Sequence, residues 1–287
     1  MAETTKKAGT AVASTSVKPK GEGNLIAVLA PILCILGGYG IWRFVIGDAG
    51  NFKKPDTSGA WFWPDHKEPK NAFFRMYEGG IIVPVLIGLI LMVLVFSIER
   101  FITISKAQGR GSNAAFIRKV QTHLANKNVD AALAECDKQK GSVGNVMKAG
   151  LGRYKEMVSN TELSTDQKIA AITKEVEEAT ALELPMLQKN LVFLSTITSV
   201  ATLVALLGTV MGMIKSFGAL GEAGGGSGAA ELAVGISEAL YNTATGIFGS
   251  AFAMVMYNIF TTKIDGITYA IDESGFTLTQ SFASLYK

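Results

Sequence analysis

One carboxylate lies among small polar residues at the start of a long uncharged stretch near the end of the chain. Glu238 is followed by Asn242, Thr243 and Thr245, and no further charge occurs until Lys263. A carboxylate is costly to bury in hydrocarbon, and even a lone hydroxyl or amide needs a partner there. Either this stretch barely enters a membrane, or its polar side chains face a wet interior in which a proton could be exchanged.

The composition requires a search for membrane spans before any fold is considered. Of the 287 residues, 48% are hydrophobic and only 18% are charged. A bilayer is crossed by about 20 consecutive apolar residues in a helix. Four charge-free runs reach that length: 24–42, 79–98, 190–214 and 239–262.

Basic residues predict the orientation of these spans. Lys6, Lys7, Lys18 and Lys20 precede the first span, and Arg100, Lys106, Arg110, Arg118 and Lys119 follow the second. The positive-inside rule places both regions in the cytoplasm, so the connection between the two spans is extracytoplasmic. Arg43 and several lysines in that connection oppose this assignment, whereas its aromatic run 61–63 suits an interfacial anchor. A cleaved signal peptide is the alternative for the first span, but the apolar stretch is longer than usual for one.

The predicted fold is therefore all-α: a polytopic membrane protein with four transmembrane helices, a helical cytoplasmic domain and both termini in the cytoplasm. The expected parts are a disordered tail (1–23), an extra N-terminal span (24–47), a periplasmic link (48–78), a second span (79–105), the cytoplasmic domain (106–189), a third span (190–217), a periplasmic turn (218–232), a fourth span (233–263) and a cytoplasmic tail (264–287).

Helical patterns fill the cytoplasmic section. Ser112-Asn113 can cap a first helix, and two more are expected around VDAALAECDKQ and VGNVMKAGLGRYKEMV. Ser164 or Thr165 can cap an amphipathic helix that we expect to run directly into the third span, with a bend at Pro185.

No residue constellation in the sequence supports an enzyme, a metal site or a cofactor. His66 and His123 lack a second ligand at metal spacing, and Cys34 and Cys136 are not expected to form a disulfide. The stretch EAGGGSG (222–228) lacks the GK[ST] ending of a phosphate loop. A net charge of +3 is too small to indicate nucleic acid.

The third and fourth spans each have one small, polar face at helical spacing. On the third span this face comprises Ser195, Thr198, Thr202, Ala205, Thr209, Gly212 and Ser216, and on the fourth it comprises Glu238, Asn242, Thr243, Thr245, Gly246, Gly249 and Ser250. Such faces are ordinary where membrane helices pack. A carboxylate within one of them indicates a functional site, unless Glu238 lies in the first helical turn and only complements the dipole. Spacing alone leaves both alternatives open.

The motifs of these two spans resemble the MotA/TolQ/ExbB proton-channel family, most closely its ExbB branch. The matching stretches are LLGTVMGMIKSF (206–217) and GISEALYNTATGIFGSAFAMVMYNIF (235–260), supported by Glu99-Arg100 and the VDAALAECDK and VGNVMKAGL segments. The chain departs from the family pattern at Thr202 and Ala205, where Pro and Gly are usual, at Tyr241-Asn242, and in having the extra first span.

The resemblance implies a pentameric ring in a bacterial inner membrane, with the third and fourth spans around a central pore. It implies an ExbD-like single-span partner, present as a dimer in the pore, and a TonB-like transducer driven by proton flow for outer-membrane import. By motif, the proton pathway would be Glu238, Thr209 and Thr243. Supporting pore-lining positions would be Thr198, Thr202, Ala205, Gly212, Asn242, Thr245, Gly246 and Gly249. A TolQ-like or gliding or flagellar motor stator, and a non-conducting scaffold, are the alternatives.

Overall fold

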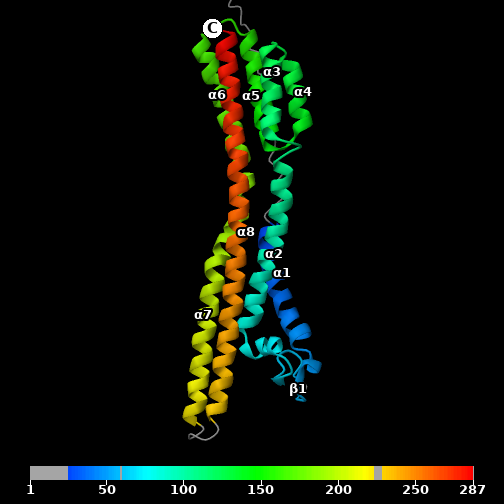
Figure 1. The fold of residues 1–287 in the computed structure, drawn as a ribbon, viewed down its shortest axis with the longest axis vertical. Helices are drawn as coiled ribbons and strands as arrows, with labels where there is room; N and C mark the ends of the chain where they lie inside the picture. Colours follow the sequence, from blue (N-terminus) through cyan, green and yellow to red (C-terminus); the bar gives the residue numbers. More distant parts are fainter. Residues whose placement is uncertain (1–24, 59, 223–227, 287) are drawn as a thin grey trace, which may run out of the picture.

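The computed structural model describes residues 25–58, 60–222 and 228–286 and forms a long helical rod (Figure 1). The predicted tail 1–23 lies outside these residues, as does 223–227 of the predicted turn. The helices are α1 (Leu25–Gly40), the π-helix η1 (Ile41–Ile46), the 3-10 helices η2 (Ala49–Asn51) and η3 (Ala72–Gly79), α2 (Ile82–Ala107), α3 (Asn113–Ala125), α4 (Val129–Gln139), α5 (Gly141–Ser159), α6 (Thr165–Gln188), α7 (Leu191–Glu222) and α8 (Gly228–Leu285).

Four of these helical stretches are long and apolar enough to cross a membrane, in agreement with the four expected spans. They begin at Val28, Ile82, Thr165 and Leu232. Helix α7 extends to Glu222 and α8 begins at Gly228, so helix replaces both ends of the predicted turn 218–232. The segment 264–285, expected as a tail, continues α8 without interruption. The chain is thus an all-α, multi-pass membrane protein.

The extra N-terminal helix packs closely on α2. A side chain added at Gly88 of α2 would lie 2.9 Å from the Cα atom of Ile35 on α1. Small residues allow such close approach of helices in lipid. After α1 the chain forms a short antiparallel hairpin of β1 (Phe52–Lys54) and β2 (Lys67–Pro69), in which Phe52 pairs with Pro69. This hairpin leads into η3 beside the start of α2 (Figure 1).

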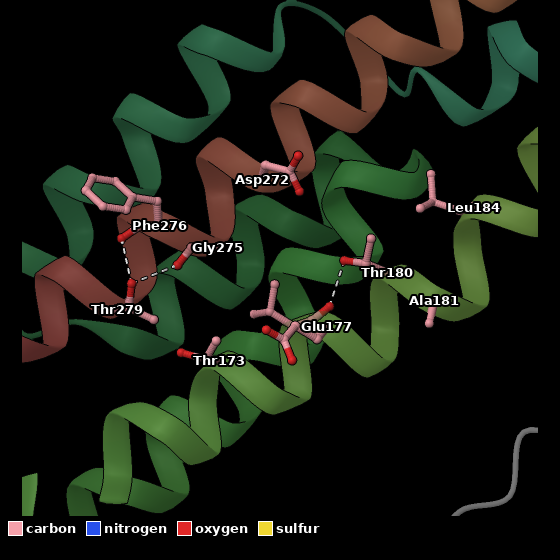
Figure 2. A pocket seen from close by; sticks show the side chains of 10 residues that line it. Thr173, Glu177, Thr180, Ala181, Leu184, Asp272, Gly275, Phe276 and Thr279 are labelled. Carbon is pink, nitrogen blue, oxygen red and sulfur yellow. Dashed lines mark hydrogen bonds between the residues drawn. The ribbon is translucent and has the colours of Figure 1, made fainter. Parts of the chain in front are cut away.

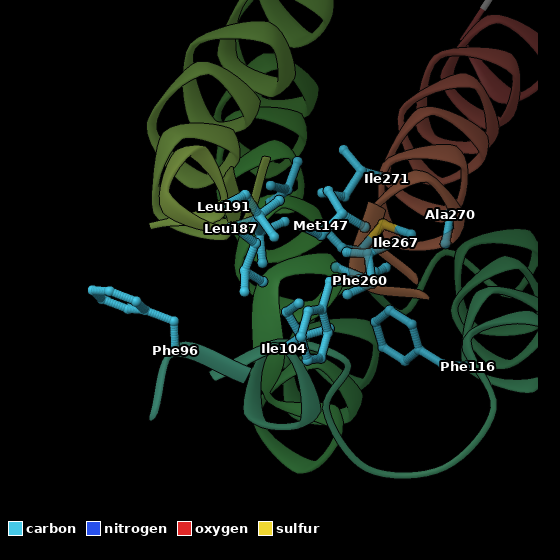
Figure 3. Close-up of a cluster of buried hydrophobic side chains, with 14 of the residues drawn as sticks. Phe96, Ile104, Phe116, Met147, Leu187, Leu191, Phe260, Ile267, Ala270 and Ile271 are labelled. Carbon is cyan, nitrogen blue, oxygen red and sulfur yellow. The ribbon is translucent and has the colours of Figure 1, made fainter. Parts of the chain in front are cut away.

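Helices α3–α6 form a bundle with the C-terminal half of α8 at the other end of the rod (Figure 1). Figure 3 shows its apolar core where the bundle meets the membrane helices, with Phe96 and Ile104 of α2 near Leu187 and Phe260. Ser164 is the cap of α6, and its reciprocal bonds with Gln167 form a capping box.

The expectation that α6 runs directly into α7 and bends at Pro185 is wrong. Pro185 lies inside α6, and the helix ends at Gln188. The break occurs at Lys189-Asn190, where Asn190 adopts a left-handed φ of 65°. Arg100 of α2 stabilises this break, because its Nη1 donates to the carbonyl of Leu187 at 3.2 Å while its guanidinium pairs with Glu99.

Candidate functional site

The predicted polar face of α7 lies against part of the predicted polar face of α8 within one chain. The faces meet through small side chains: a Cβ atom added at Gly212 would lie 3.0 Å from the Cβ of Ala239, and one added at Gly246 would lie 2.8 Å from the carbonyl oxygen of Ala201. Ala205 is fully buried in this interface. The contact therefore leaves no room for bulky residues and brings the hydroxyl-bearing residues of both helices together.

At the centre of this interface, the hydroxyls of Thr209 and Thr243 contact each other. Each hydroxyl also lies within hydrogen-bond distance of a carbonyl one turn earlier, Ala205 for Thr209 at 3.1 Å and Ala239 for Thr243 at 3.3 Å. Each hydroxyl has only one proton, so three donations cannot exist at once. Either Thr209 donates to Thr243, which donates to Ala239, or Thr243 donates to Thr209, which donates to Ala205. The pair can thus reverse its direction.

Glu238 lies well inside α8 and is not an N-terminal cap. The helix begins at Gly228, about three turns earlier, which rules out the first-turn role left open by the sequence. Its side chain is half-buried. The charges of Lys215 on α7 and Glu78 on η3 act on its carboxylate. Glu238 precedes Thr243 on α8 by five residues, about 7.5 Å along the helix axis but about 140° around it, so Glu238 lies nearer the side of Asn242 than that of Thr243.

The other predicted residues divide between two sides of α8. Thr198 faces it from α7, because its carbonyl accepts a bond from Ser250. Thr202 and Thr245 are half-buried and bond back to carbonyls of their own helices. Asn242 and Gly249 instead face the second span: Asn242 Nδ2 lies 3.3 Å from the carbonyl oxygen of Gly79, and a Cβ at Gly249 would lie 2.9 Å from Ile90. These two residues pack against the chain's own helices.

The opposite faces of α7 and α8 are apolar and exposed in the single chain. The exposed side chains include Leu203, Leu207, Val210 and Ile214 on α7, and Leu240, Ile247, Phe248 and Val255 on α8. In a membrane protein such surfaces contact lipid or other protein chains.

A groove between α6 and the C-terminal half of α8 is distant from this interface along the rod (Figure 1). Figure 2 shows Glu177 and Thr180 from α6 opposite Asp272 and Thr279 from α8. The Thr180 and Thr279 hydroxyls donate to carbonyls of their own helices, at 2.7 Å to Val176 and 2.9 Å to Phe276. The groove is mainly apolar, and these hydroxyls already have partners within the chain.

Sequence reasoning missed three residues next to the site. Gly208 lies where α7 meets α2, and a Cβ there would lie 2.9 Å from Ile82 and 3.1 Å from Asn242 Nδ2. Glu78 and Gly79 belong to η3. The sequence predicts Glu78 at the end of the periplasmic link and Gly79 at the start of the second span. The one sequence feature that could have pointed to these residues is Glu78 itself, a carboxylate directly before the second apolar run 79–98.

Comparison with known proteins points to a family of membrane proteins. Residues 138–273 match the model of the MotA/TolQ/ExbB proton channel family. The Tol-Pal system protein TolQ of Pseudomonas aeruginosa is 30% identical over 121 residues, which cover 42% of this chain and 52% of the relative. A putative biopolymer transport protein, ExbB-like 1, of Synechocystis is 41% identical over 85 residues, covering 29% of this chain and 34% of the relative. The match thus spans about half the length of one relative and about a third of the other.

Proposed function

We propose that this chain, whose residues 138–273 form a domain of the MotA/TolQ/ExbB proton channel family, is a stator subunit that converts proton flow into mechanical work. The contact between Thr209 and Thr243 is the observation that carries the proposal. It joins two residues that the family motifs single out, and the paired hydroxyls can donate in either direction. In a non-conducting scaffold, the small residues around Thr209 and Thr243 would be enough for the two helices to pack, and the paired hydroxyls would not be needed.

In this proposal Glu238 takes up and releases the proton. Its half-buried position inside α8 places the carboxylate away from bulk solvent, and the Thr209–Thr243 pair, little more than one turn further along α8, would accept and donate as the proton passes. A single chain does not enclose a pore with one helix pair. We therefore propose a homopentamer in the inner membrane, with α7 and α8 innermost, an ExbD-like dimer in the centre, and both termini in the cytoplasm.

The driven system is either a TonB-type transducer for outer-membrane import or a TolQ-like system for envelope maintenance. Relatives of both kinds match the chain, and the match to TolQ of Pseudomonas aeruginosa covers a larger share of it than the match to ExbB-like 1. A deletion strain separates the two. Loss of growth on scarce iron or haem supports import, whereas detergent sensitivity with normal iron-limited growth supports the TolQ-like role.

Glu238→Gln tests conduction itself, because it keeps the shape of the side chain and removes the ionisable group. The variant is expected to assemble normally and to fail to restore whichever phenotype the deletion strain loses. Glu273→Gln, an exposed carboxylate in the other half of α8, is the matched control and should restore it fully. A Glu238→Gln protein that restored full activity would leave the scaffold as the better account.

A further inference from the structure

A second carboxylate, Glu78, directly precedes Gly79, whose carbonyl contacts Asn242 of α8 one turn beyond Glu238. Glu78 lies on η3, outside the four candidate spans, and its side chain is half-buried. The charge of Glu78 acts on the Glu238 carboxylate, and the charges of Lys215 and Asp65 act on both groups. Within the part of the chain that the structure describes, no ion pair engages Glu78, Lys215 or Glu238.

The residue before Glu78 is anchored to the extra helix. Tyr77 is buried, and its ring stacks on that of Trp42 in η1, with centroids 4.4 Å apart and planes 6° from parallel. The Tyr77 hydroxyl donates to the carbonyl of Pro64 at 2.6 Å, and Trp42 Nε1 donates to the carbonyl of Tyr77 at 3.3 Å. This cluster fixes the start of the Tyr77–Gly79 segment.

The residue after Glu78 is anchored to α8. Asn242, one turn beyond Glu238, is 3% exposed, and its Nδ2 lies 3.3 Å from the Gly79 carbonyl oxygen. A Cβ at Gly79 would lie 2.7 Å from Val83 Cγ2 and 3.1 Å from Asn242 Cγ, so a larger residue here would force these side chains to shift. Asn242 departs from the family pattern, and so does the extra span. Through Tyr77 and Gly79, the segment that follows the extra span therefore contacts both Trp42 and Asn242.

From this arrangement we infer that Glu78 is a further residue of the proton path, held between Tyr77 and Gly79 so that it passes protons between the η3 side and Glu238. The inference rests on the proposed function. Burial raises the pKa of the Glu78 carboxyl, the negative charge of Asp65 adds to this effect, and the positive charges of Arg75 and Lys215 oppose it. A carboxyl group with a raised pKa holds its proton to a higher pH than an exposed one, which suits a group that accepts a proton and passes it on. The protein thus supplies its own proton-accepting group at the η3 end of α8.

The test uses membrane vesicles from cells that make the full-length protein, so that any native partner is present. The vesicles contain a pH-sensitive dye, and the initial rate of internal acidification is measured after the external pH is lowered. The rate in vesicles from the deletion strain is subtracted. Glu78→Gln should reduce the remaining rate about a hundredfold, the lower end of what a positioned proton-transfer group contributes. Glu78→Asp should retain much of the rate, since the carboxylate remains.

Glu68→Gln is the matched control, because Glu68 is an exposed carboxylate of the same segment that pairs with Lys54. Its rate should equal that of the unchanged protein. Normal conduction by Glu78→Gln together with lost conduction by Glu238→Gln would overturn the role of Glu78 alone. Equal rates with and without the unchanged protein would instead defeat the proposed function. If both Glu78→Asp and Glu78→Gln gave less assembled protein than the unchanged chain, Glu78 would have only a structural role.

Discussion

The hydroxyl of Thr209 on α7 contacts the hydroxyl of Thr243 on α8, although the two residues are 34 positions apart in the chain. Their helices approach closely because Gly212, Gly246 and Ala205 lie around the contact. The same small residues that permit helix packing thus bring the two hydroxyls together. The interface is therefore both a packing surface and a chain of exchangeable hydrogen bonds.

Thr243→Val should impair proton-driven activity without preventing assembly. Valine has nearly the shape of threonine but cannot donate to Thr209, so the reversible chain is lost. We expect a fall of about a hundredfold in the vesicle acidification rate. Thr243→Ser keeps the hydroxyl and should have a mild effect. Thr268→Val is the control, because Thr268 on the same helix also bonds back to a carbonyl, that of Ile264 at 3.1 Å. An equal loss of acidification rate in Thr243→Val and Thr268→Val would contradict a role of the Thr209–Thr243 hydroxyl pair in proton transfer.

Gly208→Val should destabilise the junction of α7, α8 and α2. The added side chain would collide with Ile82 and Asn242, and overpacking of this kind costs about 1–3 kcal/mol. The expected result is a lower Tm of the purified protein in detergent. Gly218→Val is the comparison on the same helix, because a Cβ there meets nothing within 4 Å. If both variants melted at the same temperature, the close contact at Gly208 would not exist in solution.

Arg100→Ala should destabilise the break between α6 and α7. The Arg100 side chain is 2% exposed, and its removal takes away the charged partner of the partly buried Glu99, which keeps only Asn190 and Thr103 as donors, and the guanidinium donor of the Leu187 carbonyl. Breaking a buried pair in this way costs about 3–5 kcal/mol. Arg118→Ala, on the exposed surface of α3, should leave the Tm within a degree or so. The measurement is thermal unfolding of both full-length variants in the same detergent.

Cysteine labelling tests the orientation of the chain. Ser58 is exposed, so Ser58→Cys should react with a membrane-impermeant maleimide added outside spheroplasts. On the other side, Ser274 is unsuitable because it is fully buried, whereas Glu273→Cys is exposed and should react only after the cells are opened. Burial raises the pKa of the native Cys136 thiol to about 12, which keeps its background reaction low. The reverse labelling pattern would overturn the topology.

The sequence by itself determined the four spans, the helical bundle, the family motifs and the faces on which Thr209, Thr243 and Glu238 lie. These features depend on local hydropathy and on the helical repeat, which a single segment records. It also indicated the small residues at which α7 and α8 could approach.

Only the tertiary structure decided which faces meet and where the helices break. It paired Thr209 with Thr243, turned Asn242 and Gly249 toward the second span, and placed the break at Asn190 rather than at Pro185. It also brought Glu78 within electrostatic reach of Glu238. A polar stripe on one helix has the same pattern whether it faces a pore, a neighbouring helix or a loop. The choice depends on packing between residues far apart in the chain, which periodicity does not contain.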